Sequence, residues 1–373
     1  MQRQRFWLVC FFSLFSALLL TSSACSTGPA EDSIKLPTFL TEEYNEIPTE
    51  GRTLCSRGGK YSFFVRKGSV NKVVIDFEGG GACWNAFTCS IKDAIFKDNI
   101  DNVRKLLKDG YDKGIYNTKD ERNPFRNWYH VFIPYCTGDL HWGDNDVEYT
   151  TDKGEKFTMR HRGAVNARAA LDWVNANFSK PEDIFITGCS AGSYGSIGWS
   201  GHIAEHYKKS KIYQVGDCGA GVVTRSFMKE SFPSWKAEKV IPTWIPGLAP
   251  DKFDITEQDL SVLYINIANH YKNHLFAQYN TAYDENQFFY FNAMGGGNKD
   301  EWNKQMRSMI DKIKTSAPNF RSFIAKGQKH CVVPYEEFYT YEVNGTKFHQ
   351  WVADLVSGKE VPHISCDGDS CKP

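Results

Sequence analysis

The sequence predicts an α/β fold, in which helices cover both faces of a mostly parallel sheet. Short apolar runs bounded by turn residues recur along the chain, and segments with helical spacing lie between several of them. Strands that alternate with helices favour a parallel sheet of this kind. The 373 residues are 41% hydrophobic, which is enough to bury a large core. Because we find no internal repeat and no low-complexity linker, we expect a single domain over residues 46–373.

The individual elements follow from these patterns. Apolar runs predict strands, in chain order, at 72–77, 128–135, 183–188, 212–216, 274–280 and 320–325. Helical spacing predicts helices at 162–178, 257–271 and 300–314. Residues 233–250 are rich in proline, so we expect irregular structure there, either as a cap over a site or as a surface excursion.

The N-terminus indicates export. Arg3 and Arg5 precede an apolar run at 6–20, which is shorter than the roughly 20 residues that a membrane span needs. We therefore assign residues 1–24 to a signal peptide. Cleavage before Cys25 would make the protein a cell-envelope lipoprotein anchored at that residue. An ordinary signal peptidase site is the alternative, and the product would then be periplasmic or secreted. Residues 25–45 begin with small polar side chains, as expected of a flexible tether.

Charge and cysteine content narrow the partners. Lys plus Arg and Asp plus Glu number 44 each, so we expect no nucleic-acid partner and no electrostatic binding to a membrane. Eleven cysteines suit an exported protein. If the signal removes Cys10 and a lipid occupies Cys25, one thiol among the others stays unpaired. The cysteine spacings do not match zinc sites, so we expect no metal. We also expect no cofactor and a monomer.

Residues 188–192, with the sequence GCSAG, lie between a predicted strand and a helix-like segment. This arrangement matches the G-x-S-x-G nucleophile elbow, in which small neighbours let a serine occupy a strained turn with its hydroxyl exposed. The pattern predicts an α/β-hydrolase fold with Ser190 as the nucleophile. A tight turn that merely needs glycine is the alternative.

In such hydrolases the acid and then the histidine follow the serine along the chain. His330 comes shortly after the predicted strand 320–325, where the general base belongs. Asp284 follows the strand at 274–280, and a carboxylate there would hold the imidazole in the correct tautomer. Asp217 also follows a strand and is the alternative acid.

An oxyanion hole is predicted directly after the strand 72–77. Gly79, Gly80 and Gly81 allow backbone amides to approach a developing negative charge, and the amide of Ala191 would be the second donor. The loop resembles the HGGG loop of esterases, with Glu78 in place of the histidine. A phosphate cradle is disfavoured because no P-loop lysine with serine or threonine follows.

A family resemblance is carried jointly by the segments FEGGGACWNAFTC, IPYCTGD, TGCSAGSYGS, YNTAYDENQ and KGQKHC. From about residue 54 onward the chain resembles the pectin acetylesterase family, which includes the Notum-type carboxylesterases. The resemblance implies an α/β-hydrolase that removes O-acyl groups. By motif position the resemblance implies that Ser190 is the nucleophile, Asp284 the acid and His330 the base. It also implies that the oxyanion amides belong to Gly80, Gly81 and Ala191.

The acyl group is inferred from a departure from the family. Gly81 and Ala82 stand where Notum-type members carry bulky aromatic residues, so we expect removal of acetyl groups from a carbohydrate. A carboxylesterase for longer acyl chains is the alternative, as is a non-catalytic carbohydrate-binding surface protein. Residues expected to contact the sugar are Trp84, Asp139, His141 and Trp142.

Two further motifs and the disulfides complete the expectations. Residues 202–206 spell H-x-x-E-H, a zinc-protease pattern. A polar helix face is the favoured explanation, because these residues belong to the helix that follows the elbow and should pack on the sheet. Cys189 is disfavoured as a thiol nucleophile, because it precedes the apex of the elbow and should point into the packing below. We expect disulfides Cys83–Cys89 and Cys55–Cys136, together with a bond from Cys331 to Cys366 or Cys371.

Overall fold

The computed structural model describes residues 36–91 and 95–373. The predicted signal peptide and Cys25 lie outside the described residues. Residues 36–45, which we expected to belong to a tether, contact the domain. Leu40 is buried in the core, and the ring of Phe39 packs edge-on against Trp173 with centroids 6.2 Å apart.

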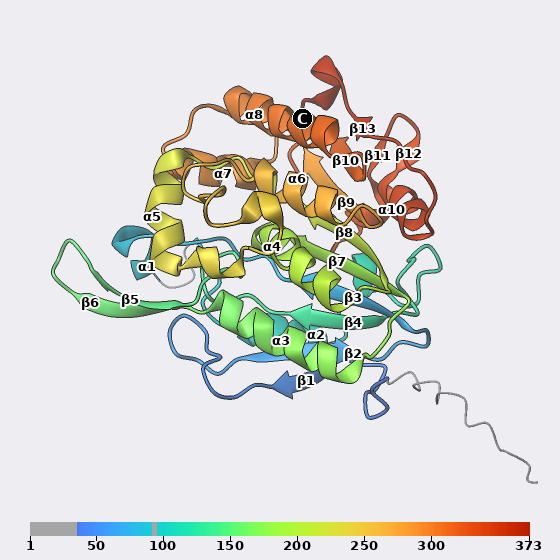
Figure 1. Ribbon diagram of the computed structural model, residues 1–373, viewed down its shortest axis with the longest axis horizontal. Coiled ribbons are helices and arrows are strands. Elements are labelled where there is room, and N and C mark those ends of the chain that lie inside the picture. Colours follow the sequence, from blue (N-terminus) through green and yellow to red (C-terminus); the bar gives the residue numbers. More distant parts are fainter. Residues whose placement is uncertain (1–35, 92–94) are drawn as a thin grey trace, which may run out of the picture. The chain divides into compact units, whose positions relative to one another are not determined.

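Within the described residues, a nine-stranded sheet has the strand order β1-β2-β4-β3-β7-β8-β9-β10-β13 (Figure 1). The strands from β4 to β13 run parallel, and β1 and β2 are antiparallel at one edge. The sheet strands are β1 (Asn45–Pro48), β2 (Ser62–Arg66), β3 (Lys72–Phe77), β4 (Tyr129–Ile133), β7 (Asp183–Cys189), β8 (Lys211–Asp217), β9 (Leu275–Thr281), β10 (Phe320–Ala325) and β13 (Ile364–Ser365). Separate hairpins are formed by β5 (Asn145–Thr150) with β6 (Lys156–His161) and by β11 (Glu342–Val343) with β12 (Thr346–Lys347).

Helices cover both faces of this sheet. On one face, α4 packs against β7 and β8, and α6 packs against β9. On the other, the ring of Phe348 in α10 lies 5.2 Å from that of Phe323 in β10. The α-helices are α1 (Ala86–Ser90), α2 (Asp101–Lys108), α3 (Gly163–Asn177), α4 (Ala191–His206), α5 (Arg225–Trp235), α6 (Ser261–His270), α7 (Glu285–Ala293), α8 (Lys299–Ser316), α9 (Glu337–Thr340) and α10 (Phe348–Val356). Short 3₁₀ helices are η1 (Gly114–Tyr116), η2 (Ala237–Val240), η3 (Pro246–Leu248) and η4 (Gly368–Cys371).

The predicted α/β architecture is confirmed. β3 and β10 have the predicted bounds, and the other predicted strands and helices are present with shifted ends. The sequence analysis missed β1, β2, β13 and the β5–β6 and β11–β12 hairpins. The hairpin strand β5 reads NDVEYT and alternates between exposed and half-buried positions, so it lacks the continuous apolar run by which the central strands were found.

Residues 233–250 are more regular than expected. They contain the end of α5 as well as η2 and η3, and Trp235 is fully buried. This segment packs into the core because its aromatic and aliphatic side chains outweigh the effect of its prolines. A search of the described helices finds none with the length and apolar character to cross a membrane.

Two of the described disulfides join segments far apart in the sequence, and two close short loops. Cys83–Cys89 and Cys55–Cys136 are present, which confirms those two pairs. The expectation for Cys331 is wrong, because Cys331 is bonded to Cys189, and Cys366 and Cys371 are bonded to each other. The loop after β10 turns back toward the carboxyl end of β7, which brings Cys331 to Cys189 over a sequence separation of 142 residues. Among the described cysteines, only Cys218 is free.

Candidate active site

The GCSAG segment forms the sharp turn from β7 into α4. Ser190 has φ 57° and ψ −120°, a backbone conformation that residues other than glycine rarely adopt and that is found more often at functional sites. A Cβ atom on Gly192 would lie 1.8 Å from the carbonyl oxygen of Phe77, and one on Gly188 would lie 2.3 Å from that of Gly192. Both glycines are therefore required for the turn to pack against β3. The Ser190 amide donates to the Asp217 carbonyl at 2.8 Å.

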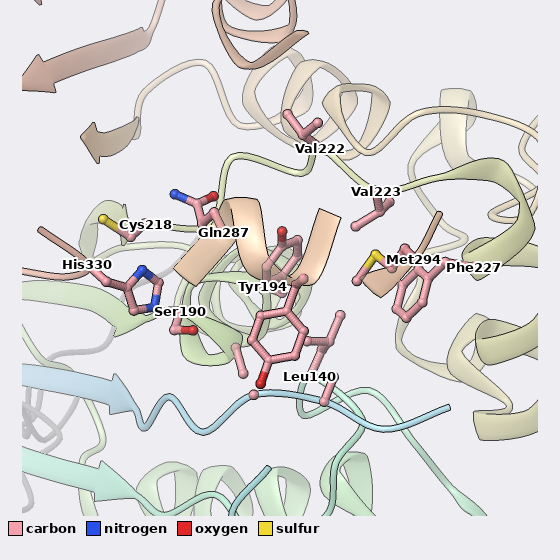
Figure 2. Close-up of a pocket in the computed structure, with 14 residues that line it drawn as sticks. Leu140, Ser190, Tyr194, Cys218, Val222, Val223, Phe227, Gln287, Met294 and His330 are labelled. Atoms are coloured by element: carbon pink, nitrogen blue, oxygen red, sulfur yellow. The ribbon is translucent and has the colours of Figure 1, made fainter. Parts of the chain in front are cut away.

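His330 is paired with a buried carboxylate. Nδ1 of His330 lies 2.9 Å from each carboxylate oxygen of Asp284, which is fully buried. Asp284 also caps α7, since its Oδ1 accepts hydrogen bonds from the Asn286 and Gln287 amides. Nε2 of His330 is buried and has no hydrogen-bond partner within residues 36–91 and 95–373. Figure 2 shows the imidazole beside the Ser190 side chain, so the two groups lie together without a direct hydrogen bond.

Two residues that the sequence analysis missed support this pair. The Gln287 amide nitrogen donates to Oδ2 of Asp284 and to Oδ1 of Asn280, both at 3.1 Å, and its oxygen accepts from the Ala220 amide at 2.8 Å. Sγ of Cys218 accepts from the Cys331 amide at 3.2 Å. Burial raises the pKa of the Cys218 thiol well above its usual value, so this thiol stays neutral.

Asp217, the alternative acid, contacts the backbone that follows His330. Its Oδ2 accepts from the Val332 and Val333 amides at 2.8 Å each. Burial raises the pKa of Asp217 to about 6. Asp217 therefore anchors the loop that carries His330, whereas Asp284 contacts the imidazole itself.

The disulfide Cys189–Cys331 joins the residue before Ser190 to the residue after His330. It ties the end of β7 to the histidine loop directly beside both side chains. Because Cys189 is in this bond, it has no thiol to act as a nucleophile, and that alternative is wrong.

The glycine loop after β3 is held by Glu78. Its carboxylate pairs with Lys97 and accepts from the Tyr135 amide at 2.8 Å. Its carbonyl oxygen lies 2.9 Å from Nε2 of His141. Glu78 thus supports the loop, in the position where HGGG-type esterases carry histidine.

Of the three candidate oxyanion donors, Gly81 and Ala191 lie beside Ser190, and Gly80 precedes Gly81 in the same loop. The Lys97 amide donates to the Gly80 carbonyl at 2.8 Å, which holds the loop in place. Gly81, with φ +75°, and Ala191 line the same cavity as Ser190. Ala191 is the first residue of α4, where backbone amides have no partner within the helix.

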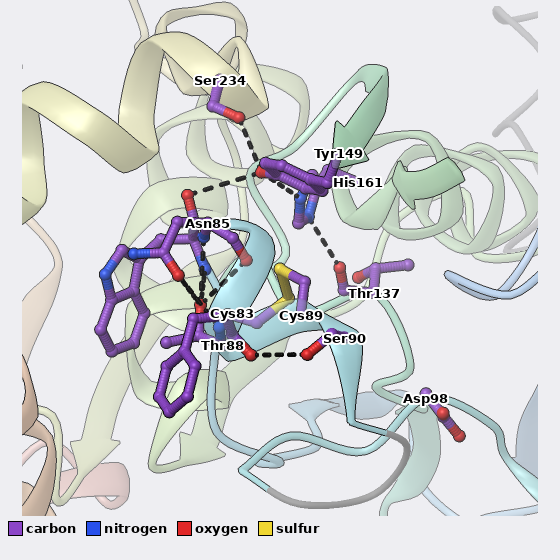
Figure 3. Close-up of a disulfide and its surroundings, with 12 residues drawn as sticks. Cys83, Asn85, Thr88, Cys89, Ser90, Asp98, Thr137, Tyr149, His161 and Ser234 are labelled. Atoms are coloured by element: carbon purple, nitrogen blue, oxygen red, sulfur yellow. Dashed lines mark hydrogen bonds between the residues drawn. A yellow bond between two sulfur atoms is a disulfide. The ribbon is translucent and has the colours of Figure 1, made fainter. Parts of the chain in front are cut away.

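The disulfide Cys83–Cys89 closes the segment that follows the glycine loop (Figure 3). It spans the start of α1, where the Asn85 side chain accepts from the Thr88 amide and Thr88 Oγ1 accepts from the Asn85 amide. Both cysteines are fully buried. The disulfide and these hydrogen bonds together fix the conformation of this segment.

A small apolar cavity opens beside Ser190 and His330 (Figure 2). Its volume is about 50 Å³. The wall includes residues that the sequence analysis did not propose as site residues, namely Leu140, Tyr194, Val222, Val223, Phe227, Tyr290 and Met294. The space beside Gly81 is filled by Tyr290, because a Cβ atom on Gly81 would lie 2.1 Å from the Tyr290 hydroxyl oxygen.

The residues expected to contact a sugar do not line this cavity, and the structure gives each another role. Asp139 is fully buried and accepts from the Gly163 amide at 2.7 Å and from the Thr137 hydroxyl at 2.6 Å. Its burial raises its pKa to about 6. Asp139 thus holds the turn into α3 instead of contacting a ligand.

The aromatic candidates are also buried. His141 contacts the Glu78 carbonyl as described, and Nε1 of Trp142 donates to the Tyr194 carbonyl at 3.0 Å. The Trp84 ring is 4% exposed and packs edge-on against Phe227, behind the cavity wall. We therefore withdraw these four residues as sugar contacts. Leu140, from the same loop as Asp139, does reach the cavity.

The H-x-x-E-H motif does not form a metal site. Nε2 of His202 lies 2.8 Å from the Val240 carbonyl oxygen, and Glu205 contacts Tyr271 and Lys208. In the described part of the chain, no cluster of three potential ligands includes His202 or His206. The motif is thus part of a helix surface.

The sheet order, the turn at Ser190 and the loops gathered at the carboxyl ends of the strands define an α/β-hydrolase fold. The family model for pectinacetylesterase matches residues 45–332. The chain belongs to the pectin acetylesterase family, which confirms the resemblance found in the sequence.

Individual relatives agree with this assignment. Pectin acetylesterase 11 of Arabidopsis thaliana is 28% identical over 206 residues, which cover 54% of this chain and 51% of that protein. Palmitoleoyl-protein carboxylesterase notum2 of Xenopus laevis is 29% identical over 155 residues, covering 38% and 28%. The matches thus span about half or less of these curated relatives.

Among solved structures, the Wnt deacylase Notum from Drosophila superimposes with a TM-score of 0.64 at 18% identity, covering 88% of this chain and 97% of that one. At this identity the likeness supports the fold alone.

Proposed function

We propose that this protein is an exported serine carboxylesterase that removes O-acyl groups, above all acetyl, from a carbohydrate. The observation that carries the proposal is the arrangement at Ser190. This serine occupies a strained turn, and His330 beside it is paired with the buried Asp284 and has an unpartnered Nε2. The family membership supports the same class of reaction.

In the proposed reaction, Nε2 of His330 takes the proton of the Ser190 hydroxyl while Oγ attacks the ester carbonyl. Backbone amides of Gly80, Gly81 and Ala191 stabilise the resulting oxyanion. The imidazolium then protonates the alcohol as it leaves, and an acyl-enzyme remains. Water activated by His330 hydrolyses the acyl-enzyme and restores the serine. Asp284 keeps the imidazole oriented throughout.

The size of the apolar cavity favours a short acyl group. A volume of about 50 Å³ has room for only a few water molecules, since one needs roughly 10–15 Å³. This suits an acetyl group and excludes most of a fatty acyl chain. Gly81 and Ala82 do not open further space, because Tyr290 occupies the region beside Gly81. The small cavity therefore favours an acetyl group over a longer acyl chain.

The test is hydrolysis of p-nitrophenyl acetate, butyrate and octanoate, run beside an acetylated polysaccharide. We expect kcat/KM to be highest for the acetate. A long apolar pocket would instead contribute up to about 0.8 kcal/mol for each of the roughly six additional methylenes, and would raise kcat/KM toward the octanoate by up to about three thousandfold. The Ser190→Ala variant should lose the activity in all assays, and a serine-directed organophosphonate should inactivate the enzyme.

Two results together would favour the non-catalytic alternative: the folded protein hydrolyses no ester, and the native protein and the Ser190→Ala variant bind carbohydrate equally well.

We also propose export and, through Cys25, a lipid anchor. Disulfides persist in oxidising compartments, and the domain contains four of them among its described cysteines. A Cys25→Ser variant should then move from the membrane fraction to the soluble fraction of the exporting cell. If it stays in the membrane fraction, or if the native protein is soluble, the anchor is wrong.

A further inference from the structure

A second cavity lies next to the turn that carries Ser190. Its volume is about 140 Å³, and Gly79 and Cys189 form part of its wall. A Cβ atom on Gly79 would lie 3.0 Å from Cβ of Ser190, so this wall touches the serine. Val333 and Pro334, which follow His330, form another part. Among the described residues, the two cavities share no lining residue.

We propose that this second cavity binds the sugar residue that carries the ester. The inference rests on the proposed function, because an ester at Ser190 has an acyl part and an alcohol part that need separate space. The acyl cavity is too small for both. Since one water molecule needs roughly 10–15 Å³, the second cavity has room for about ten of them, which is similar to the size of one hexosyl unit.

The lining suits a ring with both apolar and hydroxyl-bearing faces. Leu107 and Phe132 provide an apolar wall. At the mouth, Leu106 and Tyr335 are 44% and 39% exposed, so a ligand can reach the cavity from solvent. Sugar C–H faces pack on such surfaces, while a few placed polar groups fix the orientation.

Polar groups stand at two places in this cavity. The half-exposed Lys97 pairs with Glu78, and an ammonium has three donors, which leaves donors for a sugar hydroxyl. Deeper, Oδ2 of Asp76 accepts from the Tyr116 hydroxyl at 2.5 Å. A carboxylate can accept several hydrogen bonds, so Asp76 can also receive one from a hydroxyl.

The test compares an ester of a sugar with an ester of a minimal alcohol. The substrates are a monoacetylated methyl hexoside and ethyl acetate, both followed in a pH-stat. Leu106→Trp places a large ring at the mouth of the second cavity. We expect its kcat/KM to fall about tenfold or more further on the sugar ester than on ethyl acetate. Val70→Trp, at a surface position that lines neither cavity, is the matched control and should change neither.

A binding measurement gives an independent readout. The deacetylated methyl hexoside should inhibit ethyl acetate hydrolysis competitively, and Tyr335→Ala should raise its inhibition constant severalfold. Equal losses on both esters in Leu106→Trp, or an unchanged inhibition constant in Tyr335→Ala, would overturn the sugar site while leaving the esterase intact. If the native protein hydrolyses neither ester, the proposed function itself is wrong, and the inference falls with it.

Discussion

Removal of the disulfide Cys189–Cys331 should cost more stability than removal of any of the short-range disulfides. This bond closes a loop of 142 residues, and the other disulfides all lie outside that loop. The chain-entropy relation then assigns it about 5 kcal/mol. Cys366–Cys371, with a separation of 5 residues, is worth about 2 kcal/mol by the same relation.

The double variants Cys189→Ala/Cys331→Ala and Cys366→Ala/Cys371→Ala should therefore differ in their free energies of unfolding, measured in guanidinium chloride. The first should also lose about tenfold in kcat, because a small displacement of His330 from Ser190 slows the reaction strongly. The second should keep its kcat, since it lies away from Ser190. A loss of stability in the first variant no greater than in the second would refute the argument.

Three further predictions concern the acid, the acyl cavity and pH. Asp284→Asn should lower kcat by about 10⁴, whereas Asp217→Asn should lower the free energy of unfolding by about 1–3 kcal/mol with kcat nearly retained; the reverse pattern would contradict the assignment. Met294→Ala, which enlarges the cavity, should raise kcat/KM for p-nitrophenyl octanoate relative to acetate, and the exposed Phe39→Ala should leave the ratio unchanged; an equal ratio in both variants would contradict the location of the acyl site. The free energy of unfolding should rise between pH 4 and 6, which denaturant titrations at several pH values would measure, and a fall would contradict this prediction. Over this interval the unfolded chain binds more protons than the native protein at histidines, because burial lowers their pKa to about 4; these are His141, His161, His274 and His363. The native protein binds more protons at Asp139 and Asp217, because burial raises their pKa to about 6. The histidines outnumber the aspartates, so their effect on stability is the larger one.

The candidate site was predictable where chain order and local pattern suffice. Ser190 was indicated by small neighbours between a strand and a helix, and His330 and Asp284 by their places after later strands. The structure brings Asp284 to His330 and assigns Asp217 to the loop backbone. Their part in catalysis is the proposal tested above.

The walls of the two cavities were not predictable in this way. Leu140, Phe227 and Met294 belong to three separate segments, and each would also fit an ordinary core. Asp139 and Trp142 looked like ligand contacts because they are polar or aromatic and follow a strand. Asp139 is buried because the glycines at 143 and 163 allow the backbone to close around its carboxylate, and Trp142 is buried because Gly198 leaves room for its ring.

By itself, the sequence determined the family, the central strands and the turn at Ser190, because these depend on neighbouring residues and on spacing along one segment. Only the tertiary structure decided that Cys331 pairs with Cys189, that Tyr290 fills the space beside Gly81, and that a separate cavity lies behind Gly79. These contacts join loops that follow different strands. Their meeting depends on the order of the strands in the sheet and on how each loop folds over its edge, and a pattern within one segment carries no information about either.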